Sequence, residues 1–256
     1  MGGNKMTTPT IYLVTGANRG IGKGLVQRLL RQSSATVIAA VRDPSDPTSR
    51  DLENLPRSTG TKLITVKVDA SVPTDAKDAV ASLRGQGVTS IDVVFANAGI
   101  YEGVHSVLQT PLEDTTHHFN VNVLGPLALL QATADLLKAS QTGVPTFIAT
   151  SSELGSVGLA DVMLKTNKAA SPYGATKAML NWFIKRAAVE EPWLTSYAIH
   201  PGLVETDLIS TIESLGDLKP ISVDTSANGI LDTFRRFEAK DLNGTFRNYD
   251  GSILPW

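Results

Sequence analysis

The chain has 256 residues, of which 42% are hydrophobic and 19% charged, and its net charge is -2. These values are typical of a soluble globular protein, and they give no electrostatic reason to expect nucleic acid or an anionic membrane as partner. The chain has no cysteine, which excludes disulfides, thiolate catalysis and cysteine-ligated metals, and no apolar run approaches the roughly 20 residues of a membrane helix.

Short apolar runs with strand character alternate along the chain with longer helical patterns. Residues 1–9 begin MGGNKMTT and lack the apolar core of a secretory signal, so we expect a flexible tail before a single domain at 10–256 in a cytoplasmic protein. The predicted strands cover residues 11–15, 36–41, 63–68, 91–96, 145–150, 196–200 and 244–249. The predicted helices cover residues 21–31, 76–83, 112–139 and 173–189.

This alternation predicts an α/β fold of the doubly wound Rossmann type. Its seven-stranded, mostly parallel sheet should carry helices on both faces. In such sheets ligands bind beyond the carboxyl ends of the strands, so functional residues should follow strands rather than precede them.

The first candidate site follows the first predicted strand, where the sequence is TGANRGIG. Glycines let the backbone approach a pyrophosphate without a Cβ in the way, and the next helix directs free N–H groups at the phosphates. We interpret this loop as a dinucleotide site, although a plain strand–helix turn is the alternative. Its candidate cofactor-binding residues are Gly16, Asn18, Arg19, Gly20, Ile21 and Gly22.

Two arginines bear on the choice of cofactor. Arg19 lies in the loop, and Arg42 follows Val41 at the end of the second predicted strand. An acidic side chain at that strand end would bind a ribose 2′-hydroxyl and repel a 2′-phosphate, whereas a guanidinium binds phosphate through forked, charge-assisted bonds. The pair favours NADPH/NADP, and a one-residue shift that put Asp43 at the acidic position would reverse this preference.

Two further strand ends agree with a cofactor cleft. Asp69 follows the predicted strand at 63–68, where its carboxylate could accept a bond from the adenine amino group. The small residues Asn97, Ala98 and Gly99 follow the predicted strand at 91–96 and would let the backbone pass close to the adenosine ribose. Either feature could also be ordinary turn chemistry.

Tyr173 and Lys177 lie four residues apart at the start of a predicted helix. Positions i and i+4 share a helix face, so the ammonium can lie near the phenol. Carbonyl reduction needs a hydride at carbon and a proton at oxygen. We expect Lys177 to stabilise the phenolate, lower the pKa of Tyr173 and so make it the better proton donor. The pattern alone is weak, because many surface helices contain it by chance.

In combination, these motifs resemble the short-chain dehydrogenase/reductase family from about residue 10 to the end of the chain. The glycine loop, NAG, NVLG, SSELG with YGATK, and HPGLVET occur in the family's order. The resemblance implies that Ser152 holds the substrate carbonyl oxygen, with its neighbour Ser151 as the reserve. It also implies that Asn122 helps to hold a water in a proton relay, and that Lys177 binds the cofactor ribose.

The HPGLVET motif resembles the family's loop over the nicotinamide, which implies four more cofactor-binding residues: Pro201, Gly202, Val204 and Thr206. His200 is expected to be structural, because the tyrosine–lysine pair already supplies the proton chemistry. His117 and His118 are adjacent and point in different directions from a helix, so we expect no metal site.

One spacing departs from the family pattern. Ser152 and Tyr173 are 21 residues apart, more than is common in the family. We expect the extra residues within 157–170 to lie beside the substrate cleft without moving either side chain. The apolar segment 203–221 is the other expected wall of this cleft and a mobile lid.

The closing sequence YDGSILPW, with this spacing, resembles a subgroup of fungal ketoreductases of the norsolorinic acid ketoreductase type. The resemblance implies NADPH-dependent reduction of a ketone or aldehyde, with a hydrophobic or aromatic, polyketide-like carbonyl compound as substrate. It also implies a homodimer or homotetramer formed through the helices at 112–139 and 173–189. Two alternatives remain open: an NADPH-binding regulatory protein that acts through a protein partner, and an NAD-dependent alcohol dehydrogenase.

Overall fold

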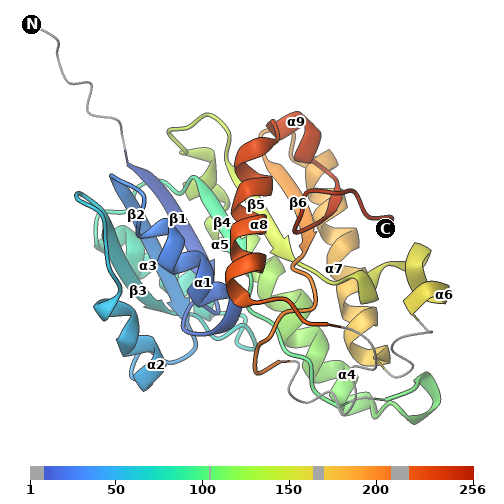
Figure 1. The fold of residues 1–256 in the computed structure, drawn as a ribbon. Helices are drawn as coiled ribbons and strands as arrows, with labels where there is room; N and C mark the ends of the chain where they lie inside the picture. The colour runs from blue at the N-terminus through green and yellow to red at the C-terminus, as the bar shows by residue number, and fades with distance from the viewer. Residues whose placement is uncertain (1–8, 104, 164–169, 209–218) are drawn as a thin grey trace, which may run out of the picture.

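The computed structural model describes residues 9–103, 105–163, 170–208 and 219–256 (Figure 1). Within these residues seven strands form a single sheet in the order β3-β2-β1-β4-β5-β6-β7, and every neighbouring pair is parallel. The sheet is therefore parallel throughout, which sharpens the prediction of a mostly parallel one. The strands are β1 (Thr10–Thr15), β2 (Ala35–Val41), β3 (Lys62–Lys67), β4 (Val93–Ala96), β5 (Thr146–Thr150), β6 (Thr195–His200) and β7 (Phe246–Asn248). Residues 1–8 of the predicted tail lie outside the described residues.

Helices cover both faces of the sheet, as predicted. One face is covered by α1 (Gly20–Leu29) and α8 (Val223–Arg236), and the other by α3 (Asp75–Gly85), α5 (Gly125–Lys138) and α7 (Ser171–Glu190). The shorter helical elements are α2 (Pro47–Arg50), η1 (Asp51–Asn54), η2 (Val107–Gln109), α4 (Leu112–Phe119), η3 (Asn120–Leu124), η4 (Glu153–Gly155), η5 (Val157–Leu159), α6 (Ala160–Met163) and α9 (Ala239–Leu242).

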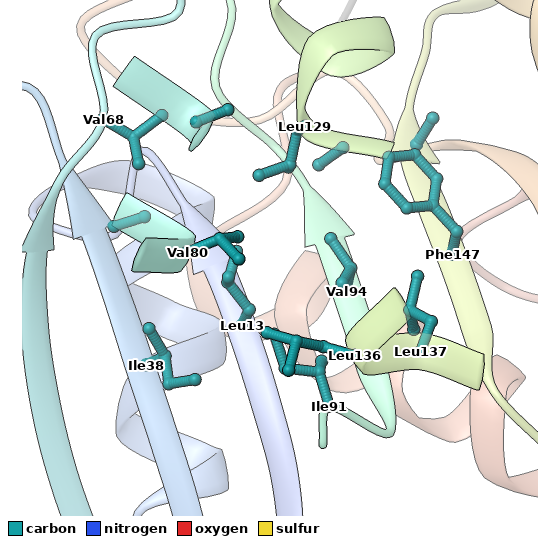
Figure 2. Packing of buried hydrophobic residues seen from close by; sticks show 14 of the residues in the cluster. Leu13, Ile38, Val68, Val80, Ile91, Val94, Leu129, Leu136, Leu137 and Phe147 are labelled. Carbon is teal, nitrogen blue, oxygen red and sulfur yellow. The ribbon is translucent and has the colours of Figure 1, made fainter. Parts of the chain in front are cut away.

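Alternation along the strands divides the core into two layers. In β1, Leu13 packs in the layer under α3 and α5, which Figure 2 shows, whereas Tyr12 and Val14 pack in the layer under α1 and α8. Successive strand residues point to opposite faces, and both faces of this parallel sheet are covered, so both sets of positions must be apolar. This explains why the strands appear in the sequence as short, nearly continuous apolar runs.

Strands β4 and β7 are shorter than predicted. Ile91 and Asp92 precede β4, where the Ile91 N–H bonds the Leu136 carbonyl and the Asp92 carboxylate accepts a bond of 2.8 Å from the Ile11 N–H. They tie neighbouring elements together at the amino end of the sheet, outside the strand ladder. Gly244 has a φ of +66°, outside the extended region, so β7 begins after it.

The predicted helix at 112–139 is interrupted, so its prediction as one regular helix is wrong in the middle. Between α4 and α5 lies the π-helical turn η3 (Asn120–Leu124), where the Gly125 N–H bonds the Asn120 carbonyl five residues earlier. Pro126 has no N–H to donate to the Asn122 carbonyl four residues before it, so the α-helical pattern cannot continue there. Pro126 is the sequence feature that could have indicated this break.

The order of the strands places the functional cleft. The chain runs from β1 outward to β3 and then returns to β4 on the other side of β1. At this switch point the connections leave β1 and β4 in opposite directions, which opens a crevice beyond their carboxyl ends.

Candidate active site

The glycine loop after β1 is built for close approach of backbone to backbone. Gly16 has a φ of +62°, a conformation that side chains other than glycine's rarely adopt. A Cβ on Gly22 would lie 2.1 Å from the Gly16 carbonyl oxygen, so a side chain has no room there. Asn18 ties the loop to α2, since its Nδ2 donates to the Thr48 hydroxyl at 2.7 Å.

Helix α1 starts directly from this loop without a side-chain cap. Arg19 occupies the N-cap position with extended backbone, and its side chain makes no capping bond. The N–H groups of the first turn therefore have no side-chain acceptor from the N-cap residue. An anion could accept their hydrogen bonds and would be attracted by the positive end of the helix dipole. The glycine cradle and the uncapped helix fit the pyrophosphate of a dinucleotide cofactor.

The end of β2 carries the two residues that bear on the predicted 2′-position of the cofactor. Val41 is fully buried in the core, whereas Arg42 after it is exposed. The Asp43 carboxylate accepts bonds from the Ser45 amide and hydroxyl at 2.8 and 2.7 Å. These bonds hold the pKa of Asp43 below its usual value, so it stays ionised. Both side chains are exposed, but Asp43 is bonded within its own turn, which leaves Arg42 as the candidate for a 2′-phosphate.

Asp69 and the Asn97 segment make structural bonds at the next strand ends. Asp69 Oδ1 accepts bonds from the amide and hydroxyl of Ser71 at 2.9 and 2.7 Å, as in an ordinary Asx turn. The Thr15 hydroxyl accepts from the amides of Asn97 and Ala98 at 3.0 Å each. These residues lie at the predicted cleft, and turn chemistry accounts for the bonds that they make.

The HPGLVET loop runs over the glycine loop. A Cβ on Gly20 would lie 3.2 Å from the Thr206 methyl carbon, so the two loops are in contact. Arg19 pairs with Asp207 at 3.3 Å, but both side chains are largely exposed and the pair contributes little to stability. The loop is anchored beneath by Pro201, whose carbonyl accepts a bond of 2.7 Å from the buried Ser226 hydroxyl.

Two more residues of this loop are fixed by their packing. Val204 is buried and forms an isolated bridge with Ile221. Gly202 has a φ of +85°, and a Cβ there would lie 2.7 Å from the Ile221 side chain. Their packing fixes the course of the loop whose residues are predicted to contact the cofactor.

Tyr173 and Lys177 lie on the first turns of α7 and come together as predicted. The Lys177 Nζ is 5.5 Å from the centre of the Tyr173 ring and donates a bond of 2.8 Å to the Thr150 carbonyl at the end of β5. Lys177 is only 3% exposed. The Tyr173 ring meets the ring of Tyr101 edge to face, with centres 4.8 Å apart. Sequence analysis missed Tyr101, because it belongs to no motif.

The prediction that Lys177 lowers the pKa of Tyr173 is wrong for this arrangement. Burial by the surrounding protein atoms raises the pKa of the Tyr173 phenol above its usual value, the Ser152 side chain lowers it, and Tyr101 adds to the increase. Tyr173 as a whole residue remains partly exposed. Burial also lowers the pKa of Lys177 to about 8, because it disfavours the ammonium form. Tyr173 therefore keeps its proton at neutral pH.

The structure separates the two neighbouring serines after β5. The Ser151 hydroxyl donates to Asn181 Oδ1 of α7 at 2.6 Å and is fully buried. The Ser152 hydroxyl accepts a bond from the Leu154 N–H at 3.2 Å and interacts with the Tyr173 phenol. Only Ser152 thus stands beside the candidate proton donor, which supports its choice over Ser151.

Asn122 lies under the Tyr–Lys pair, and its amide group is already engaged. Its Oδ1 accepts from the Ile100 N–H at 2.9 Å, while its Nδ2 donates to the Ile100 carbonyl at 3.0 Å and to the Thr176 hydroxyl at 3.2 Å. A Cβ on Gly99 would lie 3.1 Å from this Oδ1 and 3.5 Å from Lys177 Nζ. Any water relay at Asn122 would therefore use its backbone carbonyl, to which Pro126, four residues later, has no N–H to donate.

His200 ends β6 beside the candidate site and is buried. Its Nε2 lies 3.7 Å from the Glu153 carboxylate, and burial lowers the pKa of His200 to about 4 while it raises the pKa of Glu153. A neutral imidazole at pH 7 agrees with the structural role expected for it. The pair was not found from the sequence, because its partners are far apart along the chain.

The two predicted walls of the substrate cleft are described only in part. The extra residues between Ser152 and Tyr173 begin with η5 and α6, while Leu164 and Lys165 lie outside the described residues. In the predicted lid, residues 209–218 lie outside the described residues as well. Within the described ranges, no group of three or more His, Cys, Asp or Glu side chains could hold a metal ion. No helix in those ranges has both the length and the apolar character needed to cross a bilayer.

Comparison with known proteins relates this geometry to one family. The family model for short chain dehydrogenases matches residues 10–215. The norsolorinic acid ketoreductase of Dothistroma septosporum is 36% identical to this chain, over all of the chain and 94% of that protein. A short-chain dehydrogenase of Neurospora crassa is 33% identical over 98% of the chain and 99% of its own length. Among solved structures, the NADPH-bound carbonyl reductase from chicken fatty liver is 31% identical, with a TM-score of 0.83 over 98% of this chain and all of that one.

Proposed function

The chain belongs to the short-chain dehydrogenase family and is an oxidoreductase, and from this premise we propose that it reduces a ketone or aldehyde with NADPH. One observation carries the proposal. At the carboxyl ends of the strands, the Tyr173 phenol stands between the Ser152 hydroxyl and the buried Lys177 ammonium. This set can hold a carbonyl oxygen and give it a proton.

We assign each side chain one task in this reaction. When bound, the reduced nicotinamide supplies a hydride to the carbonyl carbon. The Ser152 hydroxyl orients the carbonyl oxygen and stabilises the negative charge that develops on it. Tyr173 donates its proton to that oxygen. The Asn122 side chain bonds both Ile100 and Thr176, and so fixes the start of α7 against the backbone at Ile100. Its backbone carbonyl is the group that would hold a water for reprotonation of Tyr173.

The raised pKa of Tyr173 keeps the phenol in the protonated form that carbonyl reduction requires. A phenol that keeps its proton at neutral pH is ready to donate it to an alkoxide, which is a much stronger base than a phenolate. Alcohol oxidation would instead require the phenolate as base, which burial disfavours. Similarity to a norsolorinic acid ketoreductase and to a carbonyl reductase supports reduction over the alcohol dehydrogenase alternative.

The residues that would hold the cofactor follow from the same geometry. The glycine loop and the N–H groups of α1 suit the pyrophosphate, and the exposed guanidinium of Arg42 suits a 2′-phosphate. The Lys177 ammonium has three donors, of which the Thr150 carbonyl takes one, so two remain for the nicotinamide ribose. Similarity to a carbonyl reductase described as NADPH-bound supports this choice of cofactor.

For the substrate we propose a hydrophobic, aromatic carbonyl compound. The support is similarity over the full chain to a norsolorinic acid ketoreductase. Substrate identity transfers poorly within a shared fold, so the class is proposed and not the compound.

The test is NADPH oxidation across a panel of carbonyl compounds that includes bulky aromatic ketones and small aldehydes. We expect turnover with NADPH, with bulky aromatic ketones preferred. We also expect Arg42→Asp to weaken NADPH binding by at least about tenfold, or 1.4 kcal/mol, while NADH binding changes little. NADPH binding without turnover of any carbonyl compound would favour the regulatory alternative, and stronger binding of NADH by the wild-type protein would overturn the choice of cofactor.

A further inference from the structure

The segment 252–256 folds back over the last strand of the sheet. Ile253 forms an antiparallel bridge with Arg247, and the Leu254 N–H donates to the Phe246 carbonyl at 2.8 Å. The Trp256 ring stacks on the Phe246 ring, with centres 5.7 Å apart and an interplanar angle of 25°. Leu254 and Trp256 pack against the core, so this segment is a built part of the fold.

This segment also holds the stretch of chain that follows Ser152. The Ser156 hydroxyl donates to the Pro255 carbonyl at 2.7 Å, and the Gly158 N–H donates to the Trp256 carbonyl at 2.9 Å. A Cβ on Gly158 would lie 3.1 Å from the Pro255 side chain and 3.3 Å from the Trp256 carbonyl oxygen. The two segments, about a hundred residues apart in the chain, are therefore in tight contact.

Helix α7 holds the same stretch from the other side. A Cβ on Gly155 would lie 2.6 Å from the Lys177 backbone, so η4 packs directly on the turn of α7 that carries Lys177. Lys185, further along α7, places its Nζ 5.6 Å from the centre of the Trp256 ring. Residues 153–159 are thus clamped between the helix that bears the Tyr–Lys pair and the segment 252–256.

We propose that the segment 252–256 is a positioning element for the substrate cleft. By fixing η4 and η5 it sets the start of the long connection between Ser152 and Tyr173, on which α6 packs. Trp256 and Pro255 do not touch the candidate catalytic side chains; they act through the wall beside Ser152. This inference rests on the proposed carbonyl reduction, and it assigns the selection of bulky over small substrates to that wall.

The closing experiment compares three variants with the wild-type protein. Trp256→Ala removes the stacked ring, Trp256→Phe restores a ring that can stack on Phe246, and Ile253→Ala is the matched control, since Ile253 lies in the same segment but is 67% exposed. The first readout is amide hydrogen exchange of residues 153–163. The second is the ratio of kcat/KM for a bulky aromatic ketone to that for a small aldehyde, with the dissociation constant of NADPH as a reference.

We expect Trp256→Ala to speed exchange in residues 153–163 and to lower the kcat/KM ratio by at least about tenfold, because a wall misplaced by about 1 Å can cost up to about a hundredfold in rate. Binding of NADPH should change less than about twofold, because the Trp256 ring packs on Phe246 of β7 and the glycine loop follows β1, a different strand of the sheet. Trp256→Phe should restore both readouts, and Ile253→Ala should match the wild-type protein.

Two results would overturn the inference. If amide exchange of residues 153–163 is unchanged in Trp256→Ala, the segment 252–256 does not hold the wall. If exchange is faster but the ratio of kcat/KM values is unchanged, the segment stabilises the fold without influencing the choice of substrate. The exchange comparison needs no turnover. It therefore shows whether the segment 252–256 holds the wall even if the wild-type protein reduces no carbonyl compound. That outcome would contradict the proposed function and not the contact between the two segments.

Discussion

The buried ammonium of Lys177 makes the stability of this protein depend on pH in a defined way. Lys177 is 3% exposed, and burial lowers its pKa from 10.5 to about 8. Between these two values the unfolded chain binds more protons than the folded one, so the free energy of unfolding rises with pH in this window. Below the lower value both states are protonated, and the full cost of burying the charge is present.

The size of this effect follows from the two pKa values. The difference between 10.5 and about 8 corresponds to about 3 kcal/mol of destabilisation below the lower value. Lys177→Met removes the charge at every pH and keeps most of the apolar stem. The stability of the wild-type protein relative to Lys177→Met should therefore increase by about 2 to 3 kcal/mol as the pH rises from about 7 to about 10.

Urea unfolding followed by circular dichroism at several pH values measures this difference. Lys77→Met is a matched control, because Lys77 lies exposed on α3, and its effect on stability should stay nearly constant across the same pH values. Other groups that titrate in this range cancel when variant and wild-type protein are compared at each pH. A gap between wild-type protein and Lys177→Met that does not change with pH would refute the burial of an ammonium at this position.

Two further predictions concern the glycine loop and the serines. Gly22→Ala puts a Cβ within 2.1 Å of a backbone oxygen, so it should lower stability by about 1 to 3 kcal/mol and weaken NADPH binding; Gly85→Ala, where nothing lies within 4 Å, should do neither, as urea unfolding and cofactor titration would show. Ser152→Ala should lower kcat by about 100- to 1,000-fold, as for loss of one donor to a developing oxyanion. Ser151→Ala should instead cost about 1 kcal/mol of stability with little change in kcat, and the opposite pattern would exchange the two roles.

The architecture could be predicted because a doubly covered parallel sheet leaves a strong pattern. The central strands are buried on both faces and appear as apolar runs, and β1 and β2 were located to within one residue at each end. The errors arose where local chemistry overrides this pattern. Ile91 is buried like a strand residue but bonds the end of α5, and Pro126 shifts a helix into a π turn.

The candidate site was predictable where its chemistry is local and not where it is assembled from distant segments. Tyr173 and Lys177 are four residues apart on one helix, so the sequence alone brings them together. Tyr101 packs on Tyr173, and Trp256 packs on Phe246, only in the folded chain. No spacing in the sequence predicts either contact. The pKa of Tyr173 was predicted with the wrong sign, because the burial that raises it is not visible in the sequence.

The central claim is that the Tyr173 phenol gives its proton to the substrate oxygen in a cleft that binds NADPH. Turnover by Tyr173→Phe, measured as NADPH oxidation with the best carbonyl substrate of the panel, tests it most directly. We predict a fall in kcat of about 100- to 10,000-fold, as expected for loss of a general acid, with the dissociation constant of NADPH nearly unchanged. A Tyr173→Phe variant that turns over like the wild-type protein would contradict the account.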